Sequence, residues 1–143
     1  MKTCLSLLPF CLIALGQTPA PAAKPSAYLE LVQDAKSRIK ELDVEQLKSL
    51  KASGENFTLI DVREESEFAA GHAAGAVHLS KGVIERDIET KVPRKSAKVV
   101  LYCGGGSRSA LAADALLKMG YSNVLSLEGG INAYKKAGLP TEK

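Results

Sequence analysis

Cys103 begins the stretch of this chain whose residue types are best suited to chemistry. An apolar run with two β-branched residues, Val99 and Val100, precedes it and favours a buried strand. Helix-forming residues follow it and continue to a stop at Gly120. Cys103 is therefore expected at the carboxyl end of a strand, where open α/β sheets bind their ligands. The residues that lead from the cysteine into the helix are Gly104, Gly105, Gly106, Ser107 and Arg108.

The loop after Cys103 predicts a reactive thiol. Its glycines free the backbone for positive φ, and the start of a helix offers unpaired N–H groups together with the positive end of the helix dipole. These groups and the charge of Arg108 would favour a thiolate and lower the pKa of the cysteine. Cys103 is thus a candidate nucleophile that faces an anion-sized cradle. A buried structural cysteine before a tight turn is the alternative, but such a turn does not need three glycines and an arginine.

Strands that alternate with helices must hold this loop in place. Strands are expected over residues 57–62, 76–79, 99–102 and 123–127. Helices are expected over residues 27–40, 43–53, 64–70, 80–92, 107–119 and 131–137. Ser26 is expected to cap the first helix, and Asp43 forms a capping box with Gln46 at the second. The alternation predicts an α/β fold with a central, mostly parallel sheet flanked by helices on both faces.

The amino-terminal residues have the pattern of a secretory signal peptide. Lys2 precedes a short apolar run, and small residues follow that run. The apolar run is too short to span a bilayer comfortably. The sequence is therefore expected to divide into a signal peptide (1–22), a linker with a leading helix (23–40) and a globular domain (41–143). Export to the periplasm is predicted, with no membrane attachment after cleavage.

Cleavage would leave a single cysteine. Ala20-Pro21-Ala22 fits the small-residue rule for a cleavage site, and Ala14-Leu15-Gly16 is a second candidate. Cys4 and Cys11 lie within the predicted signal, where lipidation of Cys11 is a minor alternative. The mature chain would keep Cys103, and an unpaired cysteine in an exported protein indicates a reactive thiol. Disulfide exchange is disfavoured because it requires a second cysteine nearby.

Composition and charge narrow the classes of partner. The chain has 143 residues, of which 45% are hydrophobic, and this suits one globular domain. Its net charge is +3 with acids and bases interleaved, so no nucleic-acid-binding face is expected. His72 and His78 have no histidine or cysteine at metal-ligand spacing, so no metal or cofactor is expected. His72 is interpreted as a structural residue in a hydrogen-bonded loop, with a role as base to Cys103 left open.

Three motifs resemble those of rhodanese-like sulfurtransferases. Residues 103–109, Cys-Gly-Gly-Gly-Ser-Arg-Ser, are similar to the active-site loop of that family and share its spacing from cysteine to arginine. Residues 59–76, with Leu-Ile-Asp-Val-Arg-Glu, Glu-Phe and Gly-His-Ala-Ala-Gly-Ala, resemble its N-terminal motif, and residues 128–140 resemble its C-terminal motif. Tyr134 departs from the tryptophan usual in that last motif. The resemblance covers residues 39–143 and implies the rhodanese-like fold.

The resemblance also implies a sulfur-transfer reaction. Cys103 would attack the sulfane sulfur of a small anionic or persulfide donor and hold it as a persulfide. A thiophilic acceptor such as cyanide, a thiol or a protein would then remove it. The loop N–H groups would bind the charged sulfur as an oxyanion hole does. Relatives that prefer thiosulfate often carry basic groups within the loop, whereas this chain offers Arg108. A polysulfide or persulfide is therefore at least as suitable a donor as thiosulfate.

Two other functions stay open. The same fold serves cysteine-dependent phosphatases and arsenate reductases. The dual-specificity phosphatases have one more residue between cysteine and arginine, so the shorter spacing from Cys103 to Arg108 favours sulfur. A non-catalytic binding module is the second alternative, although members of that kind commonly lack the cysteine. Asp61 and Arg63, at the end of a strand expected near the cysteine strand, either support the loop or form a structural ion pair.

Overall fold

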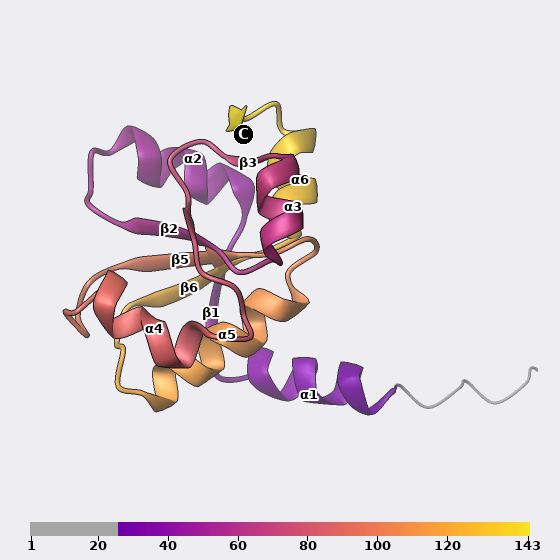
Figure 1. Cartoon of the computed structure of the whole chain (residues 1–143), viewed down its shortest axis with the longest axis vertical. Helices are drawn as coiled ribbons and strands as arrows, with labels where there is room; N and C mark the ends of the chain where they lie inside the picture. The colour runs from indigo at the N-terminus through magenta and orange to yellow at the C-terminus, as the bar shows by residue number, and fades with distance from the viewer. Residues whose placement is uncertain (1–25) are drawn as a thin grey trace, which may run out of the picture.

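Five short parallel strands form the sheet that positions the cysteine (Figure 1). The computed structural model describes residues 26–143, so the predicted signal peptide lies outside the described residues. The strand order is β1-β6-β5-β2-β4, and each neighbouring pair is parallel. The strands of this sheet are β1 (Lys40–Leu42), β2 (Thr58–Asp61), β4 (Val77–His78), β5 (Val99–Tyr102) and β6 (Val124–Leu127). The expected mostly parallel central sheet is confirmed.

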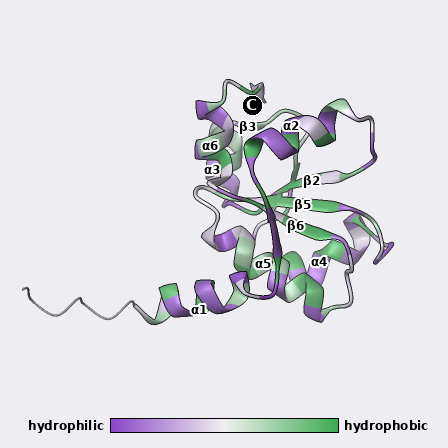
Figure 2. Ribbon diagram, turned by 180° about the vertical axis from the view of Figure 1, so that it is seen from behind, coloured by the Kyte–Doolittle hydropathy of each residue, from purple (hydrophilic) through white to green (hydrophobic). Residues whose placement is uncertain are grey.

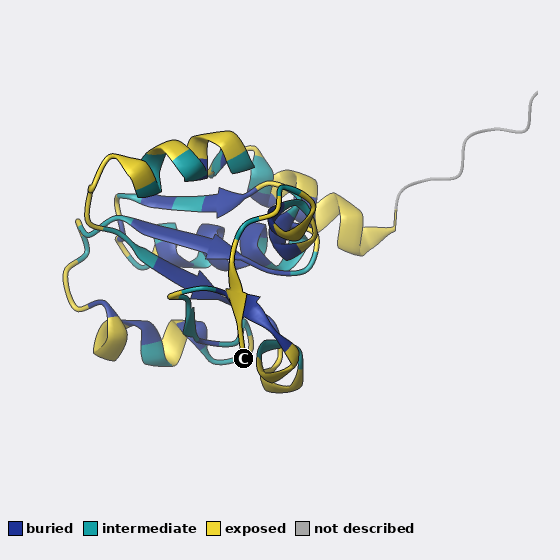
Figure 3. Cartoon of the chain, turned by 90° about the horizontal axis from the view of Figure 1, so that it is seen from above, coloured by how far each residue is buried: buried dark blue, intermediate teal, exposed yellow. Residues whose placement is uncertain are grey.

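The side chains of β5 alternate between two hydrophobic cores, one on each face of the sheet. Val99, Leu101 and Cys103 belong to one core, and Val100 and Tyr102 to the other. All four residues of β5 are buried, as expected for a central parallel strand covered on both faces. Figure 2 shows the hydrophobic character of β5 and β6, and Figure 3 shows buried strands between helices with exposed outer sides. The covering helices are α4 (Ile84–Lys91) and α5 (Ser107–Lys118) on the first face and α2 (Val44–Ala52) and α6 (Gly130–Lys136) on the second.

The helix caps follow the sequence pattern. Ser26 accepts a hydrogen bond from the N–H of Leu29 at 3.3 Å, and α1 (Ala27–Lys36) begins after it. Asp43 and Gln46 form the predicted capping box at the start of α2, with distances of 2.8 and 2.9 Å. Both cap predictions are confirmed.

Two local predictions were wrong, and the short strands β1, β3 (His72–Ala73) and β7 (Thr141–Glu142) were not predicted. The first helix ends at Lys36 instead of Lys40, because residues 40–42 form edge strand β1 beside β6. This strand has one buried residue, Leu42, so the sequence contains no apolar run that would predict it. The helix expected from Ser80 begins at Ile84, after a turn. A small antiparallel ribbon of β3 and β7 was not expected, because two-residue strands carry no periodic signal.

The leading helix α1 packs on α5. Val32 and Ala35 are its buried residues. Beyond its end, Arg38 donates to Asp114 of α5, with Nε 2.8 Å from Oδ1, and also pairs with Asp34. Within the part of the chain that the structure describes, no helix is long and apolar enough to cross a membrane.

Candidate active site

Cys103 lies directly after β5, where the strand gives way to the loop and then to α5. Cys103 is buried, with 2% of its surface exposed. The backbone N–H of Gly106 donates to the Cys103 Sγ at 3.1 Å. Gly106 adopts φ +103°, a left-handed conformation that favours glycine, and the other two loop glycines have no positive φ. The chain therefore needs glycine conformational freedom at Gly106, where the loop turns its amide toward the sulfur, and not at all three positions.

Two buried hydroxyls continue the polar surroundings of the sulfur. The Ser109 Oγ lies 3.7 Å from the Cys103 Sγ and 3.2 Å from the Gly106 carbonyl oxygen, so its proton has two acceptors within reach. Ser126 on β6 donates to the Ser109 Oγ at 2.9 Å. Both serines are fully buried. Sequence reasoning missed both hydroxyls, and only the position of Ser109 one helical turn after the loop could have suggested that one.

The surroundings of Cys103 favour its thiolate. Burial alone would raise the pKa of the Cys103 thiol. Hydrogen bonds from the N–H and hydroxyl of Ser109, and from the N–H groups of Gly106 and Gly105, outweigh this and lower the pKa below its usual value. The sequence predicted a lowered pKa through loop amides, the helix dipole and Arg108; the strongest lowering groups are the amides and a hydroxyl.

The start of α6 explains why the loop amides face inward. The Ile131 N–H donates to the Cys103 carbonyl at 2.8 Å, and the Asn132 N–H donates to the Gly104 carbonyl at 3.2 Å. A Cβ on Gly130 would lie 2.4 Å from the Cys103 carbonyl oxygen, so only glycine permits this approach. Because the loop carbonyls of Cys103 and Gly104 are bound by α6, they point away from the sulfur. The two glycines at 129–130 of the sequence were the available signal for this contact.

Arg108 lies in the first turn of α5 and carries a partner that the sequence did not suggest. Its Nη1 is 2.7 Å from the Glu67 Oε2, and its Nη2 is 2.9 Å from the Glu67 Oε1. Glu67 belongs to α3 (Glu65–Ala70). The Arg108 Nη2 would be 3.5 Å from a Cβ placed on Gly104, so the guanidinium lies over the loop. Of the other predicted loop residues, Ser107 begins α5, and a Cβ on Gly105 would meet open space.

Asp61 and Arg63 form a buried ion pair at the end of β2. The Arg63 Nη2 is 2.7 Å from the Asp61 Oδ2 and 2.9 Å from the Gly71 carbonyl oxygen. Asp61 is opposite Tyr102 in the sheet, and Tyr102 immediately precedes Cys103 in the chain. The hydrogen bonds of the pair run to each other and to Gly71, which fixes the chain between β2 and β3. A supporting role for this pair toward the cysteine loop stays a prediction.

The histidines are engaged away from Cys103. The His72 Nδ1 is 3.0 Å from the Phe68 carbonyl oxygen, and its Nε2 is 3.5 Å from a Glu142 carboxylate oxygen. The rings of His72 and Phe68 stack at 3.6 Å between centroids. The His78 Nε2 is 2.9 Å from the Arg63 carbonyl oxygen. These contacts agree with the structural interpretation of His72. Among residues 26–143, no group of three His, Cys, Asp or Glu side chains is placed to hold a metal ion.

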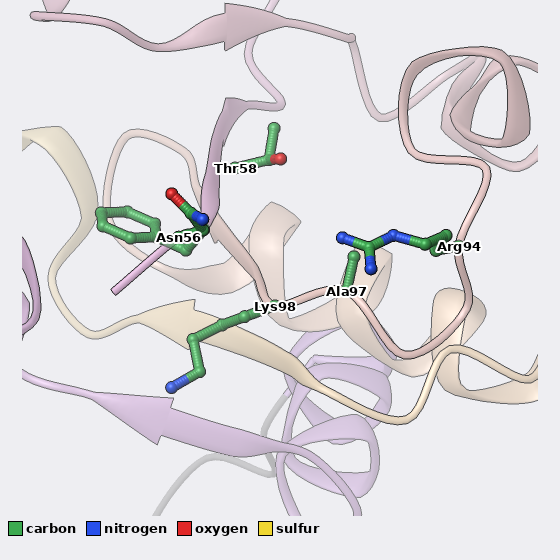
Figure 4. Close-up of a pocket in the computed structure, with 6 residues that line it drawn as sticks. Asn56, Thr58, Arg94, Ala97 and Lys98 are labelled. Carbon is green, nitrogen blue, oxygen red and sulfur yellow. The ribbon is translucent and has the colours of Figure 1, made fainter. Parts of the chain in front are cut away.

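A pocket at the other end of the sheet is separate from the cysteine. Figure 4 shows it near the start of β2 and the segment before β5, whereas Cys103 follows the end of β5. Its lining residues are Asn56, Phe57, Thr58, Arg94, Ala97 and Lys98. The pocket therefore contributes nothing to the reactive thiol.

Comparison with known proteins places the chain in a family. A family model for the rhodanese-like domain matches residues 43–137. A sulfurtransferase from Allochromatium vinosum is 37% identical over 102 residues, which cover 71% of this chain and 94% of that protein. The structure agrees with these matches, because it has a parallel sheet with the cysteine loop at the carboxyl end of its central strand. The chain belongs to the rhodanese-like domain family.

Solved structures agree on the fold, and one of them is described as a possible phosphatase. The rhodanese-like domain of the Alr3790 protein from Anabaena has a TM-score of 0.65 and 33% identity, and the match covers 71% of this chain and 77% of that one. A protein from Rhodopseudomonas palustris, described as a possible tyrosine phosphatase, has a TM-score of 0.72 and 29% identity, and the match covers 86% of this chain and 99% of that one. The rhodanese-like fold is thereby confirmed.

Proposed function

We propose that this protein is a sulfurtransferase that carries a sulfane sulfur as a persulfide on Cys103. The observation that supports this most directly is the Gly106 N–H at 3.1 Å from a buried sulfur whose pKa is lowered. In the first half-reaction, the Cys103 thiolate attacks the outer sulfur of the donor. A new S–S bond forms, the donor's bond to that sulfur breaks, and the donor residue leaves with the electron pair.

The second half-reaction returns the enzyme to its resting thiolate. A nucleophilic acceptor attacks the terminal sulfur, and the Cys103 Sγ leaves as an anion. The amides and hydroxyl that favour the thiolate stabilise this leaving group, just as preorganised donors stabilise an oxyanion. With cyanide as acceptor, the product is thiocyanate. A Cβ on Gly105 would meet open space, so we infer that donor and acceptor approach the loop from this side.

The test is a panel of sulfane donors with cyanide as acceptor, run on the wild type and on Cys103→Ser. Thiocyanate should form with the wild type, and mass spectrometry should find one added sulfur on the Cys103 peptide. The serine variant keeps a hydrogen-bond acceptor in the cradle but is a far weaker nucleophile toward sulfur, so it should form no thiocyanate. Equal activity of the variant would reject the proposal, and an unmodified Cys103 under every donor would favour a binding module.

A phosphatase is the second candidate, supported by the likeness to the Rhodopseudomonas palustris protein. Four residues separate Cys103 from Arg108, a shorter spacing than in dual-specificity phosphatases, and Arg108 is already paired with a carboxylate. Hydrolysis of para-nitrophenyl phosphate by the wild type but not by Cys103→Ser would establish this function. We expect no such hydrolysis.

We also propose that the protein is exported and acts in the periplasm. The support is the amino-terminal sequence, with Lys2, an apolar run and small residues up to Ala23. The mature amino terminus, read by mass spectrometry from a periplasmic fraction, should lie near Ala23. An intact Met1 on the protein in the cytosolic fraction would contradict this proposal.

A further inference from the structure

The ion pair of Arg108 and Glu67 sets the charge at the mouth of the cysteine cradle. Both terminal guanidinium nitrogens of Arg108 donate to the carboxylate of Glu67, one to each oxygen, at 2.7 and 2.9 Å. Glu67 is also held from the other side, because the Glu64 N–H donates to its Oε2 at 3.2 Å. Arg108 therefore meets a carboxylate that is already fixed at the start of α3.

The pair carries no net charge under ordinary conditions. Hydrogen bonding to Arg108 is the main cause that lowers the pKa of Glu67, to about 2, and the same contact raises the pKa of Arg108. Arg108 is the one basic residue of the sequence segment 103–109. Glu67 offsets much of the Arg108 charge that faces Cys103, and the other polar groups of the loop are neutral amides and hydroxyls. A site whose positive charge is offset offers little net Coulombic attraction to the second charge of a dianion.

We propose that Glu67 is a specificity-determining residue: by pairing with Arg108, it disfavours dianionic sulfur donors such as thiosulfate and selects donors of low charge, namely organic persulfides. This inference rests on the proposed sulfurtransferase function and names its substrate class. The half-exposed position of the pair supports it, with side-chain exposures of 34% for Arg108 and 37% for Glu67. Such a pair is accessible to a ligand and adds little to stability.

Two donors that differ by one charge make the proposal measurable. Thiosulfate is a dianion, and attack by the Cys103 thiolate gives the persulfide and sulfite. Methanethiosulfonate is a monoanion, and the same attack gives the same persulfide and methanesulfinate. In both cases one S–S bond forms, one breaks, and no oxidant or reductant is consumed. The ratio of their kcat/KM values thus measures how strongly the site around Cys103 disfavours the second negative charge of the donor.

The variant Glu67→Gln removes the carboxylate charge and keeps an oxygen that can accept from the Glu64 N–H. It should raise kcat/KM for thiosulfate relative to methanethiosulfonate by roughly three- to tenfold, the effect of one uncovered charge at close range in a wet site. The matched control is Glu65→Gln, which removes an exposed charge from the same helix. It should leave the ratio within about twofold, because exposed charges are largely screened. A ratio that is unchanged in Glu67→Gln would overturn the proposal.

Alkylation of Cys103 tests the same charge without any sulfur transfer. Iodoacetate and iodoacetamide have nearly the same shape, but the first is an anion and the second is neutral. The ratio of their rates at the Cys103 peptide, measured on the full chain by mass spectrometry, should rise roughly three- to tenfold in Glu67→Gln and stay unchanged in Glu65→Gln. If this ratio rises but no donor yields thiocyanate, the charge assignment stands and the sulfurtransferase function fails. If the wild type transfers sulfur but neither ratio rises, only this inference fails.

Discussion

Two arginine–carboxylate pairs with the same shortest nitrogen–oxygen distance have different roles in this molecule. Arg63 meets Asp61 at 2.7 Å, and Arg108 meets Glu67 at 2.7 Å. The side chains of the first pair are 7% and 0% exposed, whereas those of the second are 34% and 37% exposed. The distances alone would rank the two pairs as equal. Burial separates them, because it decides what the loss of one partner leaves behind.

The buried pair is part of the framework. Arg63 also donates to the Gly71 carbonyl oxygen at 2.9 Å, and its own carbonyl oxygen lies 2.9 Å from the His78 Nε2. It therefore links the end of β2 to the segments that become β3 and β4. The half-exposed pair of Arg108 and Glu67 has water as an alternative partner and lies over the cysteine loop, so its effect is on the charge that a ligand meets. We therefore assign a structural role to the Arg63–Asp61 pair and a role in substrate selection to the Arg108–Glu67 pair.

The largest expected effect is on stability, from breaking the buried pair. Asp61→Asn should lower the free energy of unfolding by about 3–5 kcal/mol, because it leaves the Arg63 guanidinium buried without a counter-charge. Glu67→Gln, made at the half-exposed pair, should lower it by less than about 1 kcal/mol. Urea unfolding of the wild type and both variants, followed by circular dichroism at pH 7, measures the two values.

The order of the two variants is the result that matters. If Asp61→Asn and Glu67→Gln lowered the free energy of unfolding equally, burial would not separate the two pairs. The distinction between a structural pair and a pair that controls charge near Cys103 would then fail. Glu65→Gln serves again as the control, since its side chain is exposed and its loss should stay within about 0.5 kcal/mol of zero.

The local parts of the site could be predicted from sequence because their residues are neighbours in the chain. The strand, the glycine loop and the helix around Cys103 are one continuous segment, and its residue types determine each element in turn. Asp61 and Arg63 were expected as a candidate ion pair for the same reason. The capping box at Asp43 is likewise encoded within four residues.

The missing parts depend on contacts between distant segments. Glu67 and Arg108 are 41 residues apart, and Ser126 is 17 residues from Ser109. Neither contact has a periodic pattern or a spacing rule. Strand β1 was missed because the residues Lys40 and Glu41 give no apolar signal, and its identity comes from pairing with β6. Only the folded sheet brings these segments together, so the selectivity that we assign to Glu67 could not be read from the loop alone.

The smallest expected effect is a loss of stability in acid that comes from the half-exposed pair of Arg108 and Glu67. The folded-state pKa of Glu67, about 2, lies below its ordinary value of 4.5, so its contribution is fully present above about pH 4.5 and disappears as the pH falls toward 2. Because the side chain is more than a third exposed, solvent screening keeps that contribution below about 1 kcal/mol.

Urea unfolding of the wild type and Glu67→Gln at pH 6, 4 and 2.5 should therefore show a small difference that shrinks with acid. Taking the difference between the two proteins at each pH cancels the titration of the other carboxylates, among them Asp114, whose pKa is also lowered to about 2 by Arg38. A difference that stays constant down to pH 2.5 would mean that the Glu67 carboxylate is not stabilised by its ionic partner. The half-exposed pair would then act through hydrogen bonding alone, whereas the buried pair depends on the counter-charge that Asp61 supplies to Arg63.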